Sequence, residues 1–293
     1  MKTIAVMSGK GGTGKTMVAA GFSVFSDEDL LLADCDVDAA NLSLLLETTD
    51  TQCRPYMGLE CAVIDENKCV GCGMCEVYCR FNAISQGDDG IYHVNPLKCE
   101  GCAVCSIVCP EGAVEIIERQ SGEVCHSESP HGRLFHAELF PGSGTSGRLV
   151  FDVKKDALDD DSSTHTPAFL IDGPPGIGCP VISAISGVDA VVLVTEPGIS
   201  ALHDLRRLVT ICRQFGVQMF LVLNKADLDE ERAEDVRKYC AEEDIEIIGT
   251  IPFDPAVIEA ARRGESVAGM ETPAAVSLKE AWKKLARAME IKQ

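Results

Sequence analysis

The chain has 293 residues, 46% of them hydrophobic, which suits one large α/β domain with a small insert and excludes a disordered chain. Its net charge of −20, from 46 acidic and 26 basic residues, disfavours binding to nucleic acid or to an anionic membrane surface. The longest apolar runs have the length of strands, and the first strand begins near the N-terminus. Neither a signal peptide nor stable membrane insertion is therefore expected, which predicts a cytoplasmic protein.

A phosphate-binding loop follows the first predicted strand, Lys2–Met7. The residues Gly9-x4-Gly14-Lys15-Thr16 stand between this strand and a predicted helix over Lys15–Phe25, the context that the pattern needs. Backbone N–H groups and the helix N-terminus would bind the phosphates, with Lys15 at the β/γ-phosphates and Thr16 at Mg²⁺. The expected nucleotide-binding residues here are Gly9, Lys10, Gly11, Gly12, Thr13, Gly14, Lys15, Thr16 and Met17.

Alternation of strands and helices defines the fold class. A second apolar strand, Leu30–Ala33, ends in Asp34-Cys35-Asp36. Later strands are predicted at Ala168–Ile171, Val188–Thr195, Val217–Leu223 and Ile245–Ile251. Helices are predicted at Pro180–Ser186, Ser200–Phe215, Asp229–Glu242, Pro255–Arg263 and Val276–Ile291. This order predicts an α/β fold of the P-loop NTPase type, with a mostly parallel sheet covered by helices on both faces.

Two cysteine quartets interrupt this alternation and repeat after 30 residues, from Cys69 to Cys99. Each reads Cys-x2-Cys-x2-Cys-x3-Cys, the spacing of ferredoxins that hold two [4Fe–4S] clusters, in which the fourth cysteine binds the other cluster. We therefore expect one cluster on Cys69, Cys72, Cys75 and Cys109, and a second on Cys99, Cys102, Cys105 and Cys79. Structural zinc is the alternative, but eight cysteines at this spacing suit cubane clusters better.

The cysteine segment resembles the bacterial two-cluster ferredoxin over about residues 60–119. It departs from that pattern at Arg80, where the motif has proline. The resemblance implies an inserted α+β ferredoxin domain at 57–119, within an ATPase domain formed by 1–56 and 120–293.

The segment after the quartets is less informative. Residues Gly122–Leu149 are expected to form a hairpin that returns to the sheet, and Lys154–Pro167 a solvated loop. A further metal site on Cys125, His126, His131 and His136 matches no metal template, which favours surface histidines. The cysteines outside the quartets are expected mostly to be buried as small apolar side chains: Cys35, Cys53, Cys61, Cys125, Cys179, Cys212 and Cys240.

Lys10 marks a resemblance to one superfamily of P-loop ATPases. Lys10-Gly-Gly-x-Gly-Lys15-Thr16 resembles the deviant Walker A motif of the MinD/ParA/Mrp superfamily, which includes the nitrogenase iron protein. This likeness implies that Lys10 crosses a dimer interface to the partner's nucleotide. It thus implies an ATP-dependent homodimer, or a heterodimer with a related ATPase.

Three further motifs extend this resemblance. Asp34-x-Asp36 is similar to its water-positioning motif, which implies that Asp36 orients the attacking water and contacts Mg²⁺ through water. Leu170-Ile-Asp172-Gly-Pro-Pro-Gly176 is similar to its Walker B and second switch, which places Asp172 near Mg²⁺ through water and Gly176 at the γ-phosphate. Lys10, Lys15, Asp36 and Asp172 are therefore the expected catalytic residues.

The last motifs concern the base of the nucleotide and one cysteine. Asn224-Lys225-x-Asp227 resembles the adenine-recognition loop, with Asn224 as the base contact, and the final strand-to-loop segment adds Pro252, Phe253 and Asp254. Cys179 lies seven residues after Asp172, at a place similar to that of the bridging-cluster cysteine of the nitrogenase iron protein. Cys179 is therefore expected either to bind a cluster shared by two subunits or to be an inert residue at the start of a helix.

Three functions fit these residues, all with ATP or ADP, Mg²⁺ and two [4Fe–4S] clusters. The first is a slow, partner-stimulated ATPase that gates electron transfer from the clusters to a redox partner protein. The second is an ATPase of iron–sulfur or metallocofactor assembly, and the third a MinD/ParA-like positioning ATPase with redox-sensing clusters. Two quartets favour electron transfer. The lack of a Cys-x-x-Cys pair outside them disfavours cluster carriers of the Mrp type.

Overall fold

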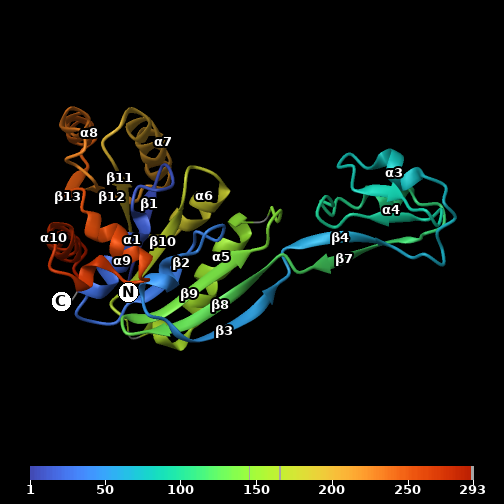
Figure 1. Ribbon diagram of the computed structural model, residues 1–293, viewed down its shortest axis with the longest axis horizontal. Helices are drawn as coiled ribbons and strands as arrows, with labels where there is room; N and C mark the ends of the chain where they lie inside the picture. Colours follow the sequence, from blue (N-terminus) through green and yellow to red (C-terminus); the bar gives the residue numbers. More distant parts are fainter. Residues whose placement is uncertain (145, 165, 292–293) are drawn as a thin grey trace. The chain divides into compact units, whose positions relative to one another are not determined.

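The computed structural model describes residues 1–144, 146–164 and 166–291, and within them the chain divides into two compact units. The first contains Met1–Cys53, Val124–Glu138 and the part from Ser146 onward, and the second contains Arg54–Glu123 and the segment from Leu139. Figure 1 traces the chain through both.

A mixed β-sheet forms the centre of the first unit. Nine strands of the described chain join in the order β13-β12-β11-β1-β10-β2-β9-β8-β3. Pairing is parallel from β13 to β9, and β8 returns as a hairpin beside β9 (Figure 1). The strands are β1 (Lys2–Ser8), β2 (Leu31–Asp34), β3 (Thr49–Tyr56), β8 (Gly122–Ser129), β9 (Gly132–Leu139), β10 (Ala168–Pro175), β11 (Ala190–Thr195), β12 (Gln218–Leu223) and β13 (Glu246–Thr250).

Helices cover both faces of this sheet, because the parallel strands are apolar on both sides. On one face α1 and α10 pack together through the rings of Phe22 and Trp282, and on the other α5, α6 and α7 contact β2, β10, β1 and β11. The helices of this unit are α1 (Lys15–Phe25), α2 (Leu42–Leu45), α5 (Ser146–Asp159), α6 (Cys179–Ile185), α7 (Ile199–Phe215), α8 (Glu230–Glu242), α9 (Pro255–Arg262) and α10 (Pro273–Ala288), with short 3₁₀ turns η1 (Asp161–Thr164) and η2 (Val267–Gly269). The predicted α/β class with a mostly parallel sheet is confirmed.

The prediction of a solvated loop over Lys154–Pro167 was wrong in its first part, because α5 continues to Asp159. Leu149, Val150, Val153 and Ala157 recur at helical spacing and are buried, so the apolar face outweighs the acidic run that follows. The Lys154 ammonium is buried and donates to the carbonyls of Ser183, Ala184 and Ser186, which end helix α6.

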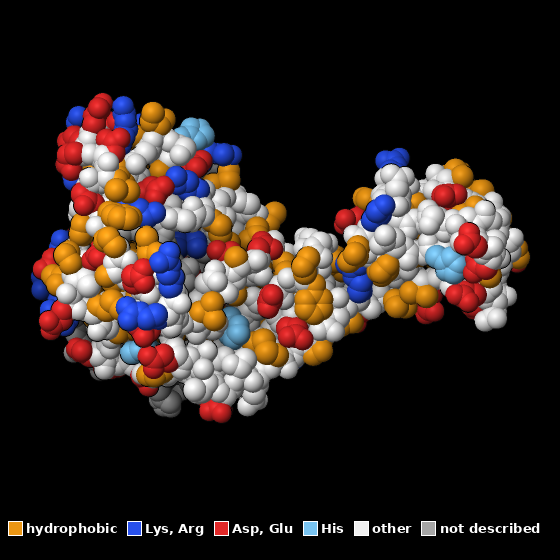
Figure 2. Space-filling model, in the orientation of Figure 1, with side chains coloured by type: hydrophobic (Ala, Val, Ile, Leu, Met, Phe, Trp, Pro, Cys, Tyr) orange, Lys and Arg blue, Asp and Glu red, His pale blue; other side chains and the backbone are white. Residues whose placement is uncertain are grey.

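The surface of the first unit is strongly charged. On the face seen in Figure 2, acidic and basic side chains alternate around α8. There Arg237 pairs with Glu230 and Glu234. Among the described helices, none has both the length and the apolar composition that crossing a membrane requires.

The second unit is small and repeats one motif. It contains β4 (Leu59–Ile64), α3 (Met74–Tyr78), β5 (Ile84–Gln86), β6 (Tyr92–Val94), α4 (Val104–Val108) and β7 (Val114–Arg119). Strand β4 pairs antiparallel with β7, and β5 pairs antiparallel with β6. Each short helix follows a residue in the left-handed conformation, Gly73 before α3 and Ala103 before α4. The two halves therefore have the same backbone conformation at this point, as well as the same cysteine spacing.

Candidate functional site

The phosphate-binding loop joins β1 to α1 at the carboxyl end of the sheet. Gly12 and Gly14 have φ of 79° and 96°, the left-handed conformation that favours glycine. A Cβ on Gly14 would lie 2.4 Å from Nδ2 of Asn224, so the loop also needs glycine for this close approach. Lys15 is the first residue of α1, and Thr16 follows it.

Lys15 is the buried cation of the site. Its Nζ lies 3.4 Å from Oδ2 of Asp36 and 3.8 Å from Oδ1 of Asp172. Burial by itself would lower the pKa of Lys15, but Asp172, Asp36 and Asp34 together raise it. The structure thus brings together Lys15, Asp36 and Asp172, three of the residues expected to be catalytic, around one ammonium group.

Asp172, in the carboxyl-terminal half of β10, has carboxylate oxygens that could bind a metal ion. Its side chain is fully buried, and within the described chain neither carboxylate oxygen has a hydrogen-bond partner. The hydroxyl of Thr13 is also buried without a partner among the residues described. Burial raises the pKa of Asp172, although Lys15 opposes this. Hard oxygen donors left unpaired beside a phosphate-binding loop are the ligands that Mg²⁺ prefers, so the donor set fits that ion.

Asp34 organises the loop after β2, a role that the sequence analysis missed. Its Oδ1 accepts from the backbone N–H of Asp36, and its Oδ2 accepts from the N–H groups of Asn41 and Leu42. Burial and the charge of Asp172 raise the pKa of Asp34 to about 7, although these hydrogen bonds oppose the rise. Asp34 therefore fixes the backbone that positions Asp36, and the repeated Asp-x-Asp was the signal available in the sequence.

Glu196 is the second residue that was missed. It follows β11, and its carboxylate lies 2.6 Å from Nζ of Lys10 and 3.0 Å from Nζ of Lys225. Burial would raise the pKa of Glu196, but Lys10 and Lys225 lower it. Its position directly after an apolar strand, at the edge where the other site residues stand, was the signal available.

The loops after β12 and β13 complete the same edge of the sheet. Asn224 donates from Nδ2 to the carbonyl of Thr13 at 2.8 Å, and Lys225 donates from Nζ to the carbonyl of Gly12 at 3.0 Å. Asp227 accepts from the backbone N–H of Phe253, which joins the two loops. Three further expected residues stand close to these loops: Met17 lies on α1 beside Gly14, Pro252 follows β13, and Asp254 caps α9 through the N–H of Ala256.

Gly176 and Cys179 stand after β10. Gly176 has φ of 95° and donates its N–H to the carbonyl of Ser8 at the end of β1, which ties this segment to the phosphate loop. Cys179 is the first residue of α6, and its thiol is exposed and free within the described chain.

Six of the quartet cysteines belong to one small apolar core of the second unit. Cys75 and Cys105 are buried in it, and the partly buried members are Cys69, Cys79, Cys99 and Cys109; Cys72 and Cys102 are exposed. A small cavity of about 20 Å³ has Cys79, Cys99, Cys102 and Cys105 in its lining. Cys79 belongs to the first quartet and the other three to the second, which is the group for which the spacing predicts a shared cluster. Backbone N–H groups of Ala83 and Ala113 donate to the sulfurs of Cys79 and Cys109, at 3.4 and 3.3 Å.

The remaining cysteines correct one expectation. Cys35, Cys61, Cys212 and Cys240 are buried free thiols, as expected. Cys53 and Cys125 instead form a disulfide between β3 and β8. The histidines of this hairpin were expected at the surface, but His136 is partly buried and bonded to Ser127, because β9 lies inside the sheet and not at its edge.

Comparisons with known proteins identify the family. The family of CobQ/CobB/MinD/ParA nucleotide-binding domains matches residues 4–267, so the chain belongs to this family of MinD/ParA-type ATPases. It is 32% identical to the uncharacterized protein MJ0578 of Methanocaldococcus jannaschii over 96% of this chain and 95% of that one.

Two further comparisons concern the fold of the chain and part of its sequence. The structure of the septum site-determining protein MinD from Pyrococcus horikoshii, complexed with Mg-ADP, superposes with a TM-score of 0.59 at 22% identity, over 98% of this chain and 96% of that one. This likeness shows the fold alone. A cytosolic Fe-S cluster assembly factor, the Nubp1 homolog of Drosophila willistoni, is 23% identical over 37% of this chain and 42% of its own.

Proposed function

We propose that the protein binds and hydrolyses ATP, and that a nucleotide-dependent dimer gates electron transfer from two [4Fe–4S] clusters to a partner protein. In this proposal the segment 57–119 is a two-cluster ferredoxin domain, and residues 1–56 and 120–293 form the ATPase domain. The partner ATPase is a second copy of the chain or a related ATPase.

The geometry of the cysteines supports the proposed clusters. Thiolates are the ligands of [4Fe–4S] clusters, and one small cavity is lined by Cys99, Cys102, Cys105 and Cys79, the four cysteines that the spacing assigns to one cluster. N–H groups aimed at Cys79 and Cys109 are the kind of donor that stabilises cluster sulfur. When bound, such clusters would each carry one electron.

The residues around Lys15 support hydrolysis with Mg²⁺. Lys15 would bind the β/γ-phosphates, and Thr16 and Asp172 would hold the metal ion. Asp36, positioned by Asp34, would orient the attacking water. Lys10, paired with Glu196 in the single chain, would leave that carboxylate to reach the partner's nucleotide.

One observation carries the link between the two activities. The chain leaves the first unit through β3 and returns through β8, and both strands belong to the sheet that also contains β2, which leads into Asp34 and Asp36. A change at the γ-phosphate would move this loop and be transmitted to the strands that carry the cysteine unit.

The test is an anaerobic EPR redox titration of the clusters, first with ADP and then with a non-hydrolysable ATP analogue. We expect a nucleotide-dependent shift of potential or line shape in the wild-type protein. Lys10→Ala should lose ATP-dependent dimerisation while keeping its iron. Identical titrations with both nucleotides would refute the gating, and unchanged dimerisation of Lys10→Ala would refute its proposed role.

A role in cluster assembly is the second candidate. Two observations favour it: partial similarity to a protein named as a cytosolic Fe-S cluster assembly factor, and the exposed thiol of Cys179. A protein loaded with labelled iron would be mixed with ATP and an apo-acceptor. Transfer of the label would support assembly, and complete retention would argue for the electron carrier.

A further inference from the structure

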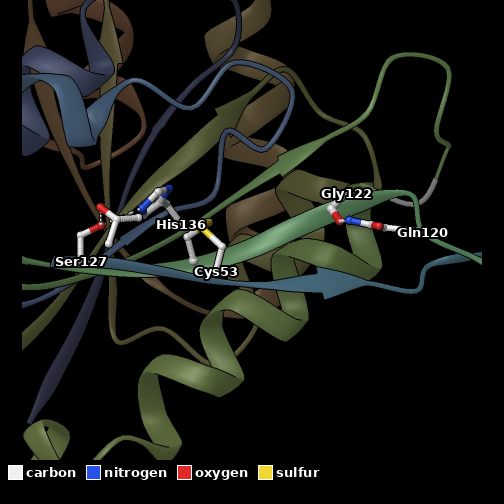
Figure 3. The surroundings of a disulfide bond; sticks show 7 residues. Cys53, Gln120, Gly122, Ser127 and His136 are labelled. Carbon is white, nitrogen blue, oxygen red and sulfur yellow. Dashed lines mark hydrogen bonds between the residues drawn. A yellow bond between two sulfur atoms is a disulfide. The ribbon is translucent and has the colours of Figure 1, made fainter.

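The disulfide between Cys53 and Cys125 lies at the edge of the nucleotide-binding sheet. Cys53 belongs to β3, the last strand in the sheet order, and its side chain is exposed, whereas Cys125 on β8 is buried. Figure 3 shows the bond between the two strands. One sulfur is thus open to attack from solvent and the other is protected, an asymmetry that makes exchange selective.

The strand register places this disulfide in one row with the nucleotide site. Asp172 on β10 is the direct neighbour of Asp34 on β2, and Asp34 is the direct neighbour of His136 on β9. The two-residue turn between β8 and β9 then sets Cys125 opposite His136, and the disulfide adds Cys53. Neighbours in register share a face of the sheet. The row thus runs from the Mg²⁺-binding carboxylate to an exposed sulfur within one unit.

A hydrogen-bonded set of polar side chains lies on the same strands as the disulfide and on the adjacent β9. Ser127 is fully buried, and its hydroxyl lies 3.1 Å from Nε2 of His136 (Figure 3). The same hydroxyl lies 2.8 Å from Oγ1 of Thr51 on the edge strand. This chain of hydrogen bonds reaches from solvent at β3 to the histidine opposite Cys125.

We propose that Cys53 and Cys125 form a redox-active site that exchanges with dithiols. A thiolate of the dithiol attacks Sγ of Cys53, a new S–S bond forms, and the bond to Cys125 breaks. The second thiol then attacks the mixed disulfide and releases Cys53. Two electrons pass from the dithiol to the pair, the dithiol becomes a disulfide, and its two protons end on the thiols of Cys53 and Cys125.

The position of the pair gives this exchange a structural consequence. The disulfide spans a sequence separation of 72 residues, and all quartet cysteines lie between its ends. It joins the strand that leads into the second unit to the strand that returns. Reduction would remove this crosslink and leave β3 held at the edge of the sheet by its hydrogen bonds to β8.

The test measures the redox state of both cysteines in the intact protein under anaerobic conditions. The protein is equilibrated with mixtures of reduced and oxidised dithiothreitol, alkylated, and mapped by mass spectrometry. We expect Cys53 and Cys125 to change together with one midpoint, while circular dichroism stays that of the folded protein. The exposed Cys179 and the buried Cys212 are internal controls that should remain thiols throughout.

Two variants test the direction of attack. With Cys125→Ser, a small aromatic disulfide should form an adduct on Cys53 quickly, whereas with Cys53→Ser the remaining Cys125 should react at least tenfold more slowly. Equal rates would overturn the asymmetry. In the wild-type protein, thiols at every dithiothreitol ratio, or a disulfide that yields only on unfolding, would overturn the proposal without any variant.

Discussion

The carboxylate of Glu196 lies 2.6 Å from the ammonium of Lys10, the residue that distinguishes this phosphate loop from an ordinary one. The same carboxylate lies 3.0 Å from Lys225, which in turn donates to the carbonyl of Gly12. In the single chain Lys10 is therefore held within its own subunit by a carboxylate at the end of β11. If Lys10 acts across a dimer, that contact must first break.

Glu196→Gln should favour the nucleotide-dependent dimer. The pair with Lys10 is partly exposed, so its loss is worth about 1 kcal/mol or less in each subunit. Two subunits together would tighten the dimer by roughly 30-fold at most. Sedimentation equilibrium with a non-hydrolysable ATP analogue measures this, with Glu230→Gln on α8 as the control. A weaker dimer would mean that Glu196 contributes to the interface itself.

Asp34→Asn should impair hydrolysis more than nucleotide binding. An amide NH₂ cannot accept the backbone N–H groups that a carboxylate oxygen accepts, so one anchor of the loop to Asp36 or Asn41 is lost. We expect kcat for ATP hydrolysis to fall by about tenfold or more, since an anchor of this kind is worth over ~1 kcal/mol. Steady-state kinetics measures kcat for ATP hydrolysis, and a titration with ADP measures nucleotide binding. Asp38→Asn, an exposed residue of the same loop, should change little; an equal loss there would argue against the anchor.

Asn224→Asp should weaken nucleotide binding through the phosphate loop. The amide of Asn224 donates to the carbonyl of Thr13, and a carboxylate at that place would put two acceptors together. A buried hydrogen bond replaced by this repulsion predicts ADP affinity lower by roughly 10- to 100-fold. Calorimetric titration with ADP measures it. Gln218→Glu, the same change in charge at the exposed start of β12, is the matched control, and similar losses in both variants would point to net charge instead.

Cysteine variants should reveal the crossed ligand sets through their iron content. If Cys79 shares a cluster with Cys102, the double variant Cys79→Ser/Cys102→Ser should keep the same half of the iron as either single variant. Cys79→Ser/Cys72→Ser should lose both clusters. Cys61→Ser removes a buried thiol close to Cys99 and should keep all the iron. Equal iron in the two double variants would contradict the crossover.

Protonation of His136 should lower the stability of the protein as pH drops below about 6.5, whereas Asp34, whose pKa is raised to about 7, acts in the opposite direction over the same range. Burial, and then the charge of His126, lower the pKa of His136 from 6.5, while Glu138 opposes them. The unfolded chain therefore binds this proton at higher pH than the folded chain, so the contribution of His136 to stability rises with pH between the lowered pKa and 6.5. Urea unfolding from pH 7.5 to 5 should show the contribution of His136 as a difference: the wild type should lose more stability, or gain less, than His136→Asn as the pH drops. His131, whose pKa burial also lowers, should leave some residual slope, and an unchanged slope would exclude His136 as a contributor.

The sequence by itself determined the features that depend on neighbouring residues. Gly9–Thr16 specify a phosphate loop because its backbone is local, and left-handed φ at Gly12 and Gly14 requires glycine there. The cysteine spacing likewise predicts that Cys79 joins the opposite quartet, which the iron content of the double variants tests. The alternation of apolar strands with helices predicted the parallel sheet, because strands that are buried on both faces are apolar along their whole length.

The tertiary structure alone decided which distant residues meet. Glu196 reaches Lys10 because β11 pairs with β1, and Asp34 stands beside Asp172 because β2 pairs with β10. Strand β3, polar and exposed, gave no apolar signal, so its pairing with β8 and the bond between Cys53 and Cys125 were missed. Strand order and register fix these contacts, and they follow from the packing of the whole sheet, which no short segment of the sequence contains.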